Sequence, residues 1–216
     1  MSVTRFAAVA LLTGLCCVSA AQTAAQANVP TRAVSVSWHD AVPAVSFALR
    51  DFLDPSVVKK LQSGLPQTLT TRVYAYGERD REALAATTLS CRVVYDLWDG
   101  VYRIERQTDK SDRTLSVKSL DGVVQQCLSA PGLVVGNAAA YQRERGRYVY
   151  FGVLLELNPL SQETVQRIRR WLARPSGSEL EGNAFFGSFV SIFVGRKLGS
   201  AEKTLSFRSE LLVVPP

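Results

Sequence analysis

Few residues in this chain of 216 could do chemistry. The only histidine, His39, could act as a general base, but no G-x-S-x-G motif accompanies it, so a serine hydrolase has little support. Asp96 and Asp99 flank a predicted hairpin tip and, with Asp51 or Asp54, could form a carboxylate pair or a calcium site. Asp99 already has a structural role in the turn, however, and Asp96 lies on the polar face of a strand. We therefore expect no enzyme, and a hydrolase using Asp96 and His39 is the least favoured alternative.

Two of the cysteines, Cys91 and Cys127, form an isolated pair that a disulfide would explain in an oxidising compartment. The bridge would close a loop of about 36 residues and stabilise the fold through the unfolded state. Two buried free thiols are the alternative. No CxxC motif is present and His39 is distant in sequence, so we expect neither a metal nor a cofactor.

The first 27 residues have the three-part pattern of a secretory signal peptide. Arg5 precedes an apolar run of 13 residues, Phe6 to Val18, and the small-residue segment SAAQTAAQA follows with cleavage sites after Ala27 or Ala21. The run is shorter than the roughly 18 residues that span a bilayer. We expect export to the periplasm or the cell exterior, with membrane association as an alternative, and a single domain over residues 28–216.

The charge balance is modestly positive, with 25 Lys and Arg against 19 Asp and Glu. No dense basic block concentrates this charge, so we do not expect nucleic acid as a partner. Contact with a lipid or membrane surface remains an alternative.

Leu89 to Ile104, LSCRVVYDLWDGVYRI, predicts a β-hairpin with Asp99-Gly100 as a two-residue turn. Further extended segments are predicted at 31–40, 41–53, 66–77, 113–118, 147–157 and 203–214. Asp54-Pro55 predicts the start of a helix over 56–63. Apolar spacing predicts a second helix over 119–129, which Pro131-Gly132 would end, and a third over 162–173. The fold class is α+β, a mainly antiparallel, sandwich-like β-sheet with three or four short helices packed on it.

Residues 184–197 fit a helix or a strand equally well. Phe185, Phe186 and Phe189 in this segment, with Trp171 of the preceding helix, form the predicted ligand or partner surface. A carrier of a hydrophobic ligand or lipid could also use six aromatic wall residues, namely Tyr74, Tyr76, Tyr95, Trp98, Tyr102 and Tyr148.

Three blocks of sequence carry a family resemblance: FALRDFLDPSVVKKLQSGLPQTLTTRVYAY, VVYDLWDGVYRI and RYVYFGVLLELNPL. In their order, over about 45–172, the chain resembles bacterial domain-of-unknown-function family 4390, a group of exported proteobacterial proteins. The resemblance implies an extracytoplasmic, sheet-rich domain and brings no catalytic residues. Residues 175–216 lie outside this pattern as a C-terminal extension.

Together these features predict an exported cell-envelope protein that serves as a non-catalytic interaction or assembly module. Its partner would be an envelope protein or a second copy of the chain. The carrier of a hydrophobic ligand or lipid is the alternative function.

Overall fold

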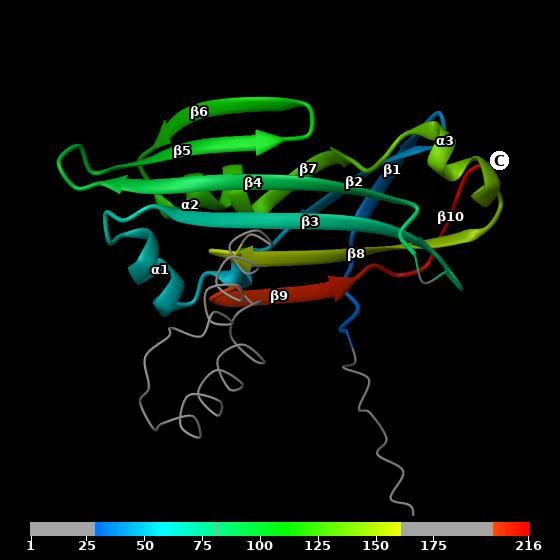
Figure 1. Ribbon diagram of the computed structural model, residues 1–216, viewed down its shortest axis with the longest axis horizontal. Helices are drawn as coiled ribbons and strands as arrows, with labels where there is room; N and C mark the ends of the chain where they lie inside the picture. Colours follow the sequence, from blue (N-terminus) through cyan, green and yellow to red (C-terminus); the bar gives the residue numbers. More distant parts are fainter. Residues whose placement is uncertain (1–28, 81, 161–200) are drawn as a thin grey trace, which may run out of the picture.

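The computed structural model describes residues 29–80, 82–160 and 201–216 (Figure 1). It is built mostly of antiparallel strands in two sheets with short helices packed on them, which confirms the predicted α+β class. The predicted leader, the helix over 162–173 and the segment 184–197 lie outside the described residues. The same is true of the predicted surface residues Trp171, Phe185, Phe186 and Phe189.

The larger sheet has seven strands. Six of them follow the order β10-β8-β3-β4-β5-β6, and the seventh, β9, pairs with the same edge of β8 as β10 does. The strands are β3 (Gln67–Gly77), β4 (Ala85–Asp96), β5 (Val101–Thr108), β6 (Ser111–Val117), β8 (Tyr148–Leu157), β9 (Lys203–Arg208) and β10 (Leu212–Val213). Alternation in β3 buries Leu69, Val73 and Ala75 and leaves Arg72 and Tyr74 on the outer face. The apolar strand β8 is paired along both of its edges, which suits its continuous apolar composition.

The smaller sheet has the order β1-β2-β7, formed by β1 (Ser35–His39), β2 (Val42–Ala48) and β7 (Ser129–Val134). The prediction that Pro131-Gly132 only ends a helix was wrong, because both residues lie inside β7. The register of β7 against β2 shifts there, and Gly132 N donates to Ser46 Oγ at 2.8 Å. An edge strand tolerates proline, and a bulge accepts the positive φ of 63° at Gly132.

Short helices connect the strands. Asp54 caps α1 (Pro55–Leu61) as predicted, because its Oδ1 accepts from Ser56 N and Val57 N, both at 2.9 Å. The segment predicted as extended up to Leu53 instead ends in the 3-10 turn η1 (Arg50–Phe52). The predicted 119–129 helix is confirmed as α2 (Leu120–Val123) continued by the π-helical turn η2 (Val124–Leu128). The sequence did not predict α3 (Ala138–Tyr141) or the turn η3 (Gln142–Glu144).

The core lies between the two sheets and takes side chains from both, with Phe52, Phe151 and Phe207 among the largest that are fully buried. The predicted disulfide is confirmed: Cys91 of β4 and Cys127 of η2 are bonded, with their Cα atoms 5.7 Å apart. Both cysteines are buried, so the bridge ties the helical turn to the larger sheet inside the core.

Candidate interaction site at the β4–β5 turn

The turn between β4 and β5 has four residues, Leu97 to Gly100, because the last pair of the ladder is Asp96 with Val101. The predicted two-residue Asp99-Gly100 turn was therefore wrong. Of these two residues only Gly100 has a positive φ, 65°, and its N–H donates to Asp96 O at 2.9 Å. The physical reason is the side chain of Asp96, which binds backbone N–H groups inside the turn and so favours the longer loop.

The carboxylate of Asp96 is the centre of this turn. Its Oδ1 accepts from Trp98 N at 2.9 Å and Asp99 N at 3.1 Å, while its Oδ2 accepts from Arg103 Nε at 3.1 Å and Nη2 at 2.8 Å. Arg103 Nη2 also pairs with Asp99 Oδ2 at 2.8 Å. The N–H of Asp99, the guanidinium of Arg103 and the N–H of Trp98 hold the pKa of Asp96 below its usual range. The side chain is thus engaged in holding the turn.

Three apolar side chains are exposed to solvent at this end of the molecule, two from the turn and one from a neighbouring loop. The exposed fraction is 98% for Trp98, 67% for Leu97 and 65% for Leu65, which lies in the loop between α1 and β3. The side chain of Leu97 packs against that loop at Gly64, so closely that a Cβ atom added to Gly64 would lie 3.2 Å from Leu97 Cδ1. Leu97 thus lies beside Gly64, the residue before Leu65. We name the three exposed apolar residues of this end, Leu65, Leu97 and Trp98, the tip patch. Figure 1 shows the β4–β5 turn beside the start of β3.

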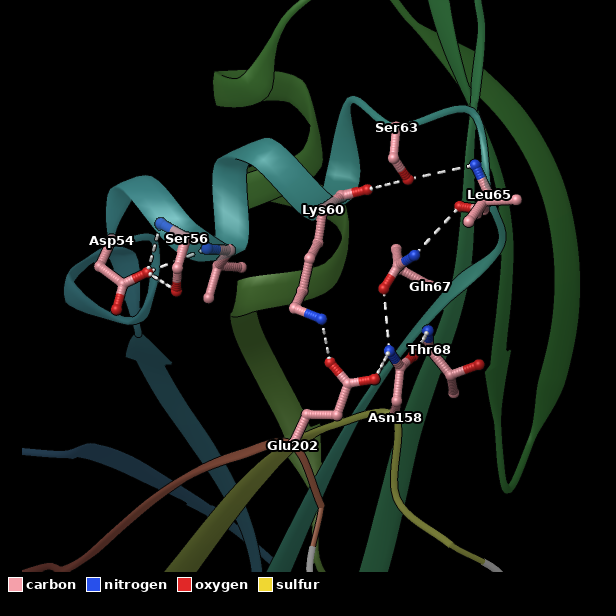
Figure 2. A network of polar contacts seen from close by, with 10 residues as sticks. Asp54, Ser56, Lys60, Ser63, Leu65, Gln67, Thr68, Asn158 and Glu202 are labelled. Carbon is pink, nitrogen blue, oxygen red and sulfur yellow. Dashed lines mark hydrogen bonds and ion pairs between the residues drawn. The ribbon is translucent and has the colours of Figure 1, made fainter.

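Hydrogen bonds fix the loop that carries Leu65 (Figure 2). Ser63 Oγ donates to Lys60 O at 2.7 Å and accepts from Leu65 N at 3.3 Å. Gln67 Nε2 donates to Leu65 O at 3.3 Å, and Asn158 Nδ2 donates to Gln67 Oε1 at 2.8 Å. The backbone of the loop is thus tied to α1, β3 and the end of β8, which leaves the Leu65 side chain directed away from the core.

The network continues to the paired ends of β8 and β9. Asn158 has a positive φ of 49°, and its Oδ1 accepts from Thr68 N at 2.7 Å while its Nδ2 also donates to Glu202 Oε1 at 3.1 Å. Lys60 Nζ lies 2.5 Å from Glu202 Oε2 (Figure 2). Lys60 and then Asn158 lower the pKa of Glu202. Lys203 Nζ bonds Asp54 Oδ2 at 2.9 Å, so every charge of this network has an opposite partner.

The structure does not bring the predicted catalytic residues together. His39 ends β1 next to Trp38, which packs on Tyr141 of α3, while Asp96 lies at the opposite end of the molecule (Figure 1). Asp51 pairs with Arg32 at 2.7 Å and Asp54 caps α1. Within residues 29–80, 82–160 and 201–216 no group of three His, Cys, Asp or Glu side chains is arranged to hold a metal ion.

The predicted aromatic wall is also divided. Tyr102 is buried and packs on Tyr95 with ring centroids 4.7 Å apart, whereas Tyr76 stacks on Tyr150 at 5.3 Å on the outer face of the larger sheet. The predicted wall residues are therefore divided between the inner and outer faces of the larger sheet. Of the predicted wall residues, Trp98 alone belongs to the tip patch. Leu65 was not among the predicted site residues, and its only signal in the sequence is a Gly-Leu-Pro loop before a strand.

No family model, curated protein or solved structure matches the chain. The described helices include none that is long and apolar enough to cross a bilayer.

Proposed function

We propose that this chain is an exported, non-catalytic interaction module of the cell envelope that binds a protein partner through the tip patch. The observation that carries the proposal is the 98% exposure of Trp98 on a turn that Asp96 and Arg103 hold in one conformation. The fold gains no packing from this indole. A binding role explains why a large apolar side chain is presented to solvent on a fixed turn.

The energetics favour this role. Tryptophan is enriched among interface residues whose removal costs 2 kcal/mol or more, and such residues insert into apolar pockets of the partner. Because hydrogen bonds already order the turn, little conformational entropy is lost when Trp98 is buried. Arg103 neutralises much of the charge of Asp96 and Asp99, so the patch has no strong net charge of its own. A convex apolar tip of this kind fits a concave apolar pocket better than a charged surface.

Two further features support the cellular location. The N-terminal pattern is typical of a secretory leader, and the Cys91–Cys127 disulfide suits an oxidising compartment. Both features support a location in which the tip patch would meet envelope proteins.

The proposal is tested by replacing Trp98 with a photo-crosslinking amino acid in the exported chain and irradiating intact cells. Arg145 is the matched control, because it is an exposed residue in a turn at the opposite end of the molecule (Figure 1). We expect a discrete protein adduct from position 98 that is absent from position 145. An added Leu97→Ser substitution should weaken it.

An adduct of twice the chain's mass would identify a second copy as the partner. Identical adducts from positions 98 and 145, lipid adducts alone, or no adduct would contradict the proposal.

A further inference from the structure

A groove of about 430 Å³ lies between residues of the two sheets, well away from the tip patch. Its walls come from the start of β4, the β5–β6 turn, and β7 with the loop after it. The apolar part includes Ala86, Ala130, Leu133 and Val134. Since Ala86 and Asp96 are ten residues apart along β4, the groove and the tip patch are separated by roughly 33 Å at 3.3 Å per residue.

Two cationic residues, Arg106 and Lys110, line the groove. Arg113 is not part of its lining but lies directly opposite Arg106 in the β5–β6 register. Two like charges opposite each other on neighbouring strands destabilise a sheet unless something compensates them. Within the described part of the chain, no carboxylate forms an ion pair with Arg106 or Arg113. Desolvation, and then the charge of Arg113, lower the pKa of Arg106.

The guanidinium of Arg106 is already oriented. Its Nε donates to Gln126 O at 3.0 Å, and within the described residues no hydrogen bond engages its two terminal nitrogens. Paired guanidinium N–H groups match the two oxygens of a carboxylate and bind them in a fork.

The remaining charge in the groove limits the charge of its ligand. Asp109 also lines the groove, and its Oδ2 accepts from Thr87 Oγ1 at 2.6 Å and from Thr88 N at 3.4 Å. Two cations and one carboxylate therefore line the groove, which suits a monoanion better than a doubly charged phosphate.

We propose that the groove binds a small amphipathic carboxylate, such as a single-chain fatty acid. Its carboxylate would lie against Arg106 and Lys110, and its hydrocarbon chain would cover Ala86, Leu133 and Val134. The volume is within the range of about 300 to 1,000 Å³ that small-molecule sites occupy. This site is independent of the tip patch and of the function proposed for it.

The test is calorimetric titration of the delipidated exported protein with decanoate below its micelle concentration. Acetate supplies the head without the chain, and decyltrimethylammonium supplies the chain with the opposite charge. We expect decanoate to bind with 1:1 stoichiometry and the two control compounds not to bind at the same concentrations. Arg106→Gln should weaken decanoate binding about 10- to 100-fold, since it removes a charge-assisted hydrogen bond. The matched variant Arg145→Gln should bind as the wild type does.

Because Arg106 also donates a hydrogen bond to the Gln126 carbonyl, Arg106→Gln could weaken binding by disturbing the fold. A second variant, at a residue without such a bond, separates the two effects. Lys110 is exposed in the β5–β6 turn, so Lys110→Glu should fold normally. It should weaken decanoate binding at least fivefold and allow decyltrimethylammonium to bind.

Three results would overturn the proposal: no saturable binding of decanoate, equal binding of acetate or decyltrimethylammonium by the wild type, or decanoate binding unchanged in both groove variants. Trp98→Ala should bind decanoate as the wild type does, so the test of the groove is independent of the test of the tip patch.

Discussion

Reduction of the Cys91–Cys127 disulfide should lower the free energy of unfolding by about 4 kcal/mol. The two residues are 36 positions apart. For a closed loop of that length, the chain-entropy relation gives an entropy loss in the unfolded chain of about 12.8 cal/mol/K, which is roughly 3.8 kcal/mol at 25 °C. At about 2 to 4 °C per kcal/mol for a chain of this size, the expected fall in Tm is roughly 8 to 15 °C. The double variant Cys91→Ala/Cys127→Ala should lose roughly 2 kcal/mol more, because it also removes two buried sulfur atoms from the core.

The assay is urea unfolding of the exported chain, followed by far-UV circular dichroism with and without reductant. The double variant is the control, because a reductant that acts only on the disulfide leaves its transition unchanged. A loss of less than about 1 kcal/mol on reducing the wild type would refute the loop-closure reasoning. A shift of the double variant under reductant would show that another effect contributes.

Three further outcomes follow from the described contacts. Trp98→Ala should change the free energy of unfolding by no more than about 0.5 kcal/mol, because the indole is exposed. Trp38→Ala removes an edge-to-face contact with Tyr141 and should lower the free energy of unfolding by about 2 to 4 kcal/mol. Equal effects of the two variants in chemical denaturation would contradict the burial argument. Tyr141→Phe should lower the free energy of unfolding by about 1 to 3 kcal/mol in the same assay, because the buried hydroxyl donates to Val135 O at 2.9 Å. No change in the free energy of unfolding would show that this carbonyl finds another donor. The lowered pKa of Asp96 predicts that this carboxylate stabilises the fold above about pH 4, and that the contribution is lost as the pH falls through the pKa of the folded state. The difference in the free energy of unfolding between wild type and Asp96→Asn should therefore shrink on acidification. A difference that stays constant from pH 7 to pH 2 would be inconsistent with that linkage.

Local signals in the sequence predicted much of the fold. Two-residue alternation located β3, because in a half-buried sheet the side-chain period itself separates core from solvent. A continuous apolar run located β8. Asp54-Pro55 located α1 because an N-cap bonds within its own turn. These features depend on neighbouring residues alone.

The errors arose where distant segments decide the structure. Strand β7 exists because β2 offers a partner more than 80 residues away, with Ser46 bonding Gly132 across the bulge. No local pattern contains that partner. The Asp99-Gly100 turn is the exception, because its error has a local cause. Asp96 and Arg103 lie within the same hairpin, and their bonds favour a turn of four residues over the two-residue turn that the composition suggests.

By itself the sequence determined the sheet-rich class, the disulfide pair, the leader-like pattern and the small number of groups able to do chemistry. These follow from composition and short-range periodicity. Only the tertiary structure decided which side chains share a surface. It joined Leu65 to Leu97 and Trp98 through the Gly64 contact, set Arg106 opposite Arg113 beside β7, and separated Asp96 from His39. The physical reason is that a surface is assembled from segments whose proximity depends on pairing and packing across the whole fold.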